Sequence, residues 1–153
     1  MKKVTTFLWF PEGAYEAARF YVSLFKGAEL VETMPGPGGV PMSATFRVDG
    51  QEFICFNGGP HHTLNPSVSL FIDCESQEEV DELWEKLTAD GGAPSVCGWL
   101  TDKYGLSWQV IPRRLKELLT SSDRDRANRA MHAMLRMTTV SYTHLTLPTK
   151  RIV

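Results

Sequence analysis

Several features on which common functions depend are missing from the sequence. No apolar run is long enough to span a membrane, and the apolar stretch after Lys3 is too short to serve as a signal peptide. The lysines and arginines are scattered, and the net charge is -2, so no basic patch marks a nucleic-acid-binding surface. We therefore expect neither a membrane nor a nucleic acid as a partner.

Cysteine is scarce as well. Cys55, Cys74 and Cys97 are odd in number and widely separated, and they contain no Cys-x-x-Cys pair. This pattern favours reduced thiols in or near the core of a cytoplasmic protein over a disulfide framework. Of the 153 residues, 42% are hydrophobic and 22% are charged, which is typical of one folded domain of ordinary size.

Hydrophobic periodicity predicts a strand, a helix and three more strands in the first half of the chain. Ala17, Phe20, Tyr21 and Leu24 fall on one face of a helix, and Gly27 follows as a C-terminal cap. Short runs rich in β-branched or aromatic residues predict strands at residues 4–10, 29–34, 42–48 and 51–56.

The second half of the chain repeats this order. Val80, Leu83, Trp84 and Leu87 have the same spacing as the first apolar stripe, and residues 76–79 match a capping box at the start of the second helix. Further strands are expected at residues 67–73, 95–100 and 106–111.

The repetition predicts an α+β fold of paired βαβββ modules. The modules cover about residues 4–57 and 66–112, and neither could bury both faces of its sheet alone. Pairing them would enclose a concave apolar surface. The alternative is a ferredoxin-like α+β sandwich in which the two halves have similar patterns by chance.

Two C-terminal helices are expected within residues 113–139, at 113–119 and 123–137. The second helix has a small apolar face that cannot stand alone in water, so it must pack on the domain or on a second subunit. We therefore predict a homodimer, which is also the commonest closed oligomer.

Several short motifs resemble those of the PhnB-like branch of the vicinal-oxygen-chelate superfamily (glyoxalase, bleomycin resistance, dioxygenase). They occur in the same order as in that branch. They lie at residues 7–10, 17–21, 57–61, 65–69, 97–99, 104–112 and 130–134. Members of this branch are often labelled demethylubiquinone methyltransferases. The sequence has no glycine-rich strand–helix loop and no parallel Rossmann-type order for S-adenosylmethionine, so we do not expect methyl transfer.

Residues 140–153 depart from this resemblance. Their first six residues, Val-Ser-Tyr-Thr-His-Leu, are the translation of GTC-TCT-TAT-ACA-CAT-CTG from a transposon-type sequencing adapter. We interpret this tail as an artefact that begins after about Thr139, and we expect it to contribute little to stability.

Resemblance to the superfamily implies a divalent metal held by His, Glu or Gln side chains on the inner sheet faces. The matching positions here are Thr5, Ser67, Ile54 and Gln109, of which only Gln109 could serve as a ligand. A catalytic metal needs about three protein ligands and an open position. We therefore predict no metal and no other cofactor.

Two histidines and one cysteine could bind a metal or act as a nucleophile, but simpler structural roles explain them. His61 and His62 are adjacent in a predicted loop, but no carboxylate stands at a spacing that would complete a metal site. Cys97 could be a nucleophile only if a cation or helix N-terminus lowered the pKa of its thiol. We favour polar loop residues for the histidines and packing for the cysteine, and no catalytic residue is assigned.

Aromatic and neutral polar residues define the predicted ligand pocket. The expected lining combines apolar walls with a few hydrogen-bonding groups, from Trp9, Phe56, Ser67, Ser69, Trp99 and Gln109. The leading hypothesis is a metal-free small-molecule-binding protein. The alternatives are a metal-dependent enzyme of the glyoxalase or dioxygenase type, and a structural domain whose pocket is filled by its own side chains.

Overall fold

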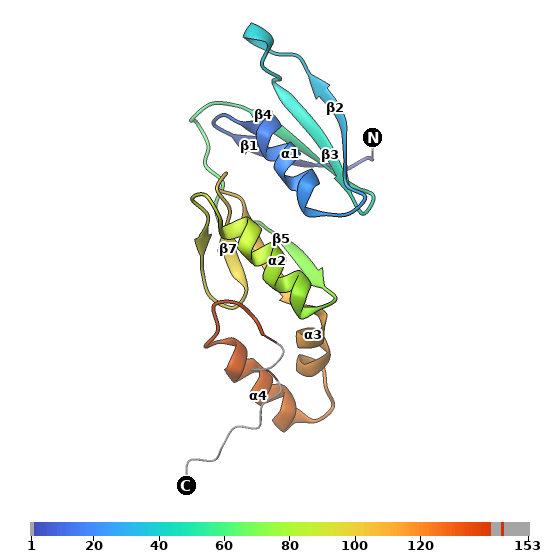
Figure 1. The fold of residues 1–153 in the computed structure, drawn as a ribbon, viewed down its shortest axis with the longest axis vertical. Coiled ribbons are helices and arrows are strands. Elements are labelled where there is room, and N and C mark those ends of the chain that lie inside the picture. Colours follow the sequence, from blue (N-terminus) through green and yellow to red (C-terminus); the bar gives the residue numbers. More distant parts are fainter. Residues whose placement is uncertain (1, 142–144, 146–153) are drawn as a thin grey trace. The chain divides into compact units, whose positions relative to one another are not determined.

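The computed structural model describes residues 2–141 and 145 and divides the chain into two compact units. Unit 1 is Met1–Asn65 and unit 2 is Pro66–Val153. Each unit contains a four-stranded mixed sheet (Figure 1). Within the described part of the chain, no helix is both long enough and apolar enough to cross a bilayer.

Unit 1 has the predicted order of elements. These are β1 (Thr6–Phe10), α1 (Ala14–Leu24), β2 (Glu29–Met34), a 3-10 turn η1 (Pro37–Gly39), β3 (Ser43–Val48) and β4 (Gln51–Asn57). The spatial order is β1-β4-β3-β2, in which β1 and β4 run parallel and the other pairs run antiparallel.

Helix α1 packs against β3 and β4 on one face of this sheet. Along β1, Leu8 and Phe10 are buried on the helix side, whereas Phe7 is 54% exposed on the opposite face. The N-cap residue before the helix is Gly13, which has no side chain to cap it. Asn57 from β4 provides the cap instead, because its Oδ1 accepts a 2.8 Å hydrogen bond from the backbone N–H of Ala14.

Unit 2 repeats the topology of unit 1. Its elements are β5 (Ser69–Cys74), α2 (Gln77–Thr88), β6 (Ala93–Pro94), β7 (Trp99–Thr101) and β8 (Ser107–Pro112), with the spatial order β5-β8-β7-β6. Strands β5 and β8 are the parallel pair. The predicted α+β class with two βαβββ modules is therefore confirmed.

Helix α2 has the predicted capping and buried face. Ser76 Oγ accepts a 3.1 Å hydrogen bond from the backbone N–H of Glu79. The Glu79 carboxylate in turn accepts from the backbone N–H of Glu75, one residue before the expected position. Val80 and Leu87 are fully buried.

The predicted strand at residues 95–100 is wrong. The structure has two short strands, β6 and β7, on either side of a turn in which Cys97 (φ 57°) and Gly98 (φ 81°) are both left-handed. The backbone N–H groups of these two residues donate to the carbonyls of Met137 and Thr138. Hydrogen bonds to residues 137–138 therefore interrupt the strand at Cys97 and Gly98. The local sequence could not predict this interruption, because the bonding partner is about 40 residues away.

A buried carboxylate organises the turn between β7 and β8. The Asp102 side chain is 3% exposed, and its Oδ1 accepts hydrogen bonds from the backbone N–H groups of Tyr104 (2.8 Å) and Leu106 (3.1 Å). Its Oδ2 accepts a 2.8 Å hydrogen bond from Trp108 Nε1. Asp102 thereby fixes the hairpin that positions β8.

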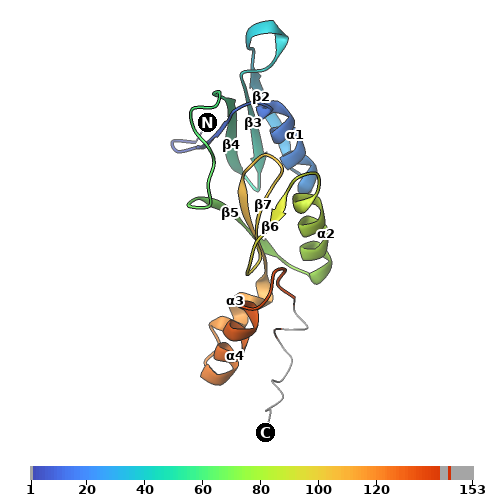
Figure 2. The ribbon, with the colours of Figure 1, turned by 90° about the vertical axis from the view of Figure 1, so that its left-hand side faces the viewer.

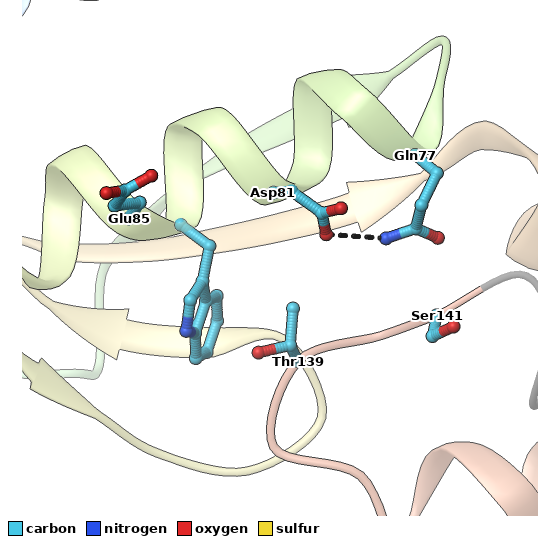
Figure 3. Close-up of a pocket in the computed structure, with 6 residues that line it drawn as sticks. Gln77, Asp81, Glu85, Thr139 and Ser141 are labelled. Atoms are coloured by element: carbon cyan, nitrogen blue, oxygen red, sulfur yellow. Dashed lines mark hydrogen bonds between the residues drawn. The ribbon is translucent and has the colours of Figure 1, made fainter.

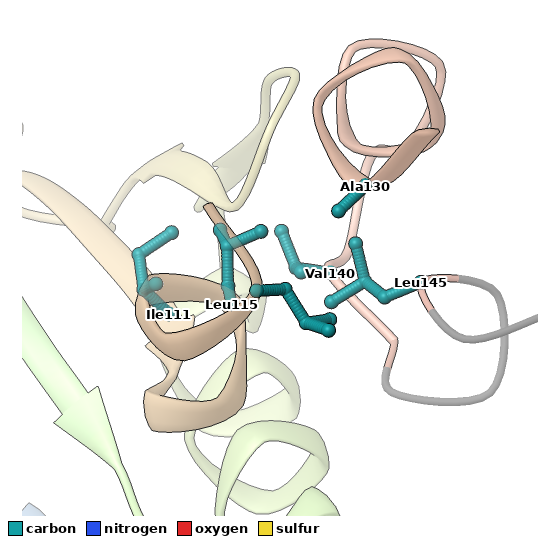
Figure 4. Close-up of a cluster of buried hydrophobic side chains, with 6 residues drawn as sticks. Ile111, Leu115, Ala130, Val140 and Leu145 are labelled. Carbon is teal, nitrogen blue, oxygen red and sulfur yellow. The ribbon is translucent and has the colours of Figure 1, made fainter. Parts of the chain in front are cut away.

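Helices α3 (Arg113–Leu119) and α4 (Arg124–Met134) follow β8 and pack together as a hairpin (Figure 2). Asp123 caps α4 by accepting a 3.0 Å hydrogen bond from the backbone N–H of Arg126. A separate apolar cluster joins the end of the sheet to this hairpin (Figure 4). It contains Ile111, Leu115, Leu118, Ala130, Val140 and Leu145.

Two residues of the tail, which we expected to contribute little to stability, pack in this apolar cluster. Val140 is fully buried and Leu145 is 5% exposed in the apolar cluster. An aliphatic side chain that follows closely after a paired segment packs into an apolar cleft whatever its origin, because burial alone lowers its free energy. The other expected tail residues, 142–144 and 146–153, lie outside the described residues, and Ser141 is half-buried.

Ending the chain at Thr139 is expected to lower the free energy of unfolding by about 2 kcal/mol, because two buried aliphatic side chains are removed. The comparison is with a chain that ends at Thr146 and keeps Val140 and Leu145. Thermal denaturation of both should show a lower melting temperature for the shorter chain only. Equal melting temperatures would mean that the cluster does not need these residues.

Candidate functional site

The face of the unit 1 sheet that α1 leaves uncovered carries aromatic rings, a few hydroxyl groups and one ion pair, between Arg47 and Glu52. Strand register places eight side chains of β1, β3 and β4 on this face, because each pair of Cα partners shares a side of the sheet. They are Phe7, Trp9, Ser43, Thr45, Arg47, Glu52, Ile54 and Phe56. Alternation along β1 puts Phe7 and Trp9 on this face and Leu8 and Phe10 on the helix side.

The indole of Trp9 is held by the loop that follows β4. Its Nε1 donates a 2.9 Å hydrogen bond to the Gly59 carbonyl, and its ring lies 5.3 Å from the Phe56 ring and 4.9 Å from the His62 ring, centroid to centroid. A side chain at Gly58 would overlap the indole, so only glycine fits there. His62 therefore packs edge-on against an aromatic wall, which agrees with its interpretation as a loop residue.

The uncovered face of the unit 2 sheet carries neutral polar groups beside one indole. Gln109 in β8 has Phe71 in β5 and Trp99 in β7 as its Cα partners. Its Nε2 donates a 3.0 Å hydrogen bond to Ser69 Oγ across β5 and β8. A half-buried amide is thus oriented on a sheet face, next to Trp99.

Ser107, two residues before Gln109 on the same face, was missed by sequence reasoning. Its side chain is 2% exposed, and its Oγ has no hydrogen-bond partner among the residues that the structure describes. Strand alternation puts Ser107 on the same face as Gln109, so the signal was available in the sequence. That the hydroxyl is buried and unpaired could be known only from the packing.

The structure brings the predicted site residues together in two groups. Trp9 and Phe56 are in contact in unit 1. Ser69, Trp99 and Gln109 are neighbours in unit 2. Ser67 is exposed and precedes β5, so it is not a strand residue.

The residues at the positions implied for a metal do not fit one. The Thr5 hydroxyl faces the Lys2 carbonyl at 3.5 Å, Ile54 is aliphatic, and Gln109 uses its amide N–H on Ser69. Within residues 2–141 and 145, no group of three or more His, Cys, Asp or Glu side chains is arranged to hold a metal ion. A divalent ion needs several such donors to replace its water.

The cysteines do not form a reactive centre. Burial, with smaller contributions from the charges of Glu79 and Asp73, raises the pKa of the Cys74 thiol to about 12, so the thiol stays protonated at neutral pH. Cys55 is also buried. Cys97 is partly exposed, and its Sγ lies 3.5 Å from the Met134 carbonyl, a contact that ties the β6–β7 turn to α4.

A hollow of about 400 Å³ lies elsewhere in unit 2, between α2 and the segment after α4 (Figure 3). Its walls contain two carboxylates and one indole, and the lining residues are Gln77, Asp81, Trp84, Glu85, Thr139 and Ser141. None of the predicted site residues lines it. Asp81 already accepts a hydrogen bond from Gln77, as the dashed line in Figure 3 shows.

Comparison with known proteins covers most of the chain. Residues 2–111 match the protein family described as 3-demethylubiquinone-9 3-methyltransferase. The structure is similar to that of a PhnB protein from Bacillus cereus, with 38% identity and a TM-score of 0.67, over 72% of this chain and 99% of that one. No curated protein matches the chain.

Two more distant structures share the fold. A protein from Pseudomonas aeruginosa is 20% identical, with a TM-score of 0.60, over 73% of this chain and 98% of that one. A protein from Bacillus cereus described as a possible glyoxalase is 18% identical, with a TM-score of 0.50, over 70% of this chain and 96% of that one. At these identities the likeness concerns the fold alone.

Proposed function

Because the chain belongs to the family described as 3-demethylubiquinone-9 3-methyltransferase, the PhnB-like branch of the glyoxalase and bleomycin-resistance superfamily, we propose that it binds a small ring-containing molecule without a metal. The observation that carries the proposal is the oriented pair of Gln109 and Ser69 on an uncovered sheet face beside Trp99. Aromatic walls with a few convergent polar groups are the usual composition of a small-molecule site.

Each unit carries a candidate surface of its own. In unit 1, Trp9 and Phe56 provide apolar area on which a flat ring can pack, and the loop of Gly58 and Gly59 keeps the indole in place. In unit 2, Gln109 and Ser69 provide hydrogen bonds that orient a polar group beside Trp99. Methyl transfer is not part of the proposal, because neither sheet has the consecutive parallel strands and glycine-rich turn of a Rossmann-type donor site.

Two alternatives make different demands on the same residues. A metal-dependent glyoxalase or dioxygenase needs a ligand set beyond Gln109. A structural domain needs a face filled by its own side chains, whereas Phe7 and Phe71 are each more than half exposed. A homodimer, which would cover such surfaces, and a cytoplasmic location both stay predictions.

Replacing Gln109 with alanine is expected to weaken ligand binding about tenfold while the fold remains intact, because one or two hydrogen bonds are lost from a half-buried position. The ligand panel is a set of neutral mono- and bicyclic aromatic compounds screened by thermal shift. Isothermal titration calorimetry of the compounds that bind then compares the variant with the original chain.

Gln51→Ala is the matched control, because Gln51 is an exposed glutamine at the start of β4. It should leave affinity unchanged. Equal affinity for Gln109→Ala would remove Gln109 from the site. Stoichiometric zinc, nickel, manganese or iron in protein purified without a histidine tag, lost in Gln109→Ala, would replace the proposal with the metal-dependent enzyme.

A further inference from the structure

We propose that the polar part of the ligand is an uncharged group with both a hydrogen-bond donor and an acceptor, such as a carboxamide, and that it pairs with Ser107. This inference rests on the proposed function and specifies its ligand class. It is carried by the hydroxyl of Ser107, which is 2% exposed on the face that holds Gln109 and has no hydrogen-bond partner within the part of the chain that the structure describes.

The Ser107 hydroxyl stands beside two other polar groups with spare hydrogen-bonding capacity. Ser69 is the Cα partner of Ser107 across β5 and β8, and its hydroxyl accepts from Gln109 Nε2. Gln109 Oε1 takes no part in that bond. The face thus offers two hydroxyl donors and one amide acceptor within adjacent positions of two strands.

A buried hydroxyl without a partner is unfavourable, because it has given up its hydrogen bonds to water. A ligand that replaces the Gln109–Ser69 bond with bonds of its own can reach Ser107 and supply the missing partner. A carbonyl oxygen would accept from Ser107 and Ser69, and an N–H or O–H of the same group would donate to Gln109 Oε1.

The side chains of this face provide no free cation for an anionic group on the ligand. Strand register puts eight side chains of β5, β7 and β8 on it: Ser69, Phe71, Asp73, Trp99, Thr101, Ser107, Gln109 and Ile111. Asp73 alone among them is charged, and its carboxylate accepts a 2.9 Å hydrogen bond from Arg113 Nε. A carboxylate or phosphate of the ligand would lose its hydration here without gaining a cation.

Three probe compounds of nearly the same shape test whether the charge and the polar atoms of a ligand decide its affinity. Benzamide is neutral and has a donor and an acceptor, benzoate is its anionic counterpart, and isopropylbenzene has neither charge nor polar atoms. Isothermal titration calorimetry at pH 7 should show benzamide binding at least tenfold more tightly than benzoate.

The variant Ser107→Ala removes only the hydroxyl. It is expected to weaken benzamide binding about fivefold, to leave isopropylbenzene binding unchanged, and to raise the melting temperature of the ligand-free protein. If Ser107 had only a structural role, Ser107→Ala would not raise the melting temperature and weaken benzamide binding at the same time. Ser23→Ala is the control, because Ser23 is exposed in unit 1 and its hydroxyl donates to the Phe20 carbonyl at 2.6 Å; it should not change binding.

The outcomes distinguish this inference from the proposed function. If isopropylbenzene binds and benzamide does not, or if Ser107→Ala weakens both equally, the site exists and the assignment to Ser107 is wrong. Tighter binding of benzoate, or a lower melting temperature of Ser107→Ala without ligand, also overturns the inference. If none of the three probes binds, the inference falls together with the proposed site for a ring of this size.

Discussion

Replacing Asp102 with alanine is expected to lower the free energy of unfolding by about 4 kcal/mol, because three donors in a buried turn lose their acceptor at once. For a chain of this length the melting temperature should fall by roughly 10 °C. Differential scanning calorimetry gives both quantities. Strand β8 carries Ser107 and Gln109, so ligand binding should weaken as well.

The size of this effect is checked with two further variants. Asp102→Asn keeps one carbonyl oxygen for the backbone N–H groups of Tyr104 and Leu106, but its amide cannot accept from Trp108 Nε1 at the same time. It should fall between Asp102→Ala and the original chain. Asp125→Ala, at an exposed position in the first turn of α4, should change the melting temperature little. An unchanged melting temperature for Asp102→Ala would show that the turn does not depend on the carboxylate.

Replacing Gly58 with alanine is expected to lower the free energy of unfolding by about 3 kcal/mol and to abolish binding of any compound that packs on the Trp9 face of unit 1. The added methyl group would occupy the space of the Trp9 indole, which must then move. Moving the indole breaks its hydrogen bond to the Gly59 carbonyl and its contacts with Phe56 and His62. Calorimetric unfolding and titration with the compounds that bind the original chain measure the two effects.

A double-mutant cycle isolates the cause of this loss. Trp9→Phe removes the part of the ring that Gly58 faces, so Gly58→Ala should cost much less stability when it is combined with Trp9→Phe. Trp9→Phe alone loses the indole hydrogen bond and some binding. An equal cost of Gly58→Ala in both backgrounds would mean that the loop, and not the indole, is what the methyl group disturbs.

The two faces of each sheet explain why a small domain can carry a site without a catalytic cluster. In unit 1, α1 covers one face and leaves aromatic side chains on the other. In unit 2, α2 does the same for a face of hydroxyl and amide groups. Unit 1 therefore offers an aromatic surface and unit 2 a neutral polar surface, and single substitutions in each unit can test the two surfaces independently.

Local patterns in the sequence determined most of the secondary structure. Helical stripes such as Ala17 and Tyr21, the capping box at Ser76, and the alternation of Leu8 with Trp9 depend on residues a few positions apart. Their physical causes act within one turn or one strand, so they can be read without knowing the fold. The repetition of this order along the chain then specified two βαβββ modules and the α+β class.

The tertiary structure alone decided which residues meet across long stretches of chain. Asn57 caps α1, the loop after β4 brings His62 against Trp9, and the Ser107 hydroxyl is buried with no hydrogen-bond partner among residues 2–141 and 145. The strand predicted at residues 95–100 gives way to a turn that pairs with residues 137–138, and Val140 enters the apolar cluster. These outcomes depend on which distant segments bond to the same backbone groups and fill the same buried space. Local sequence patterns contain no information about that choice.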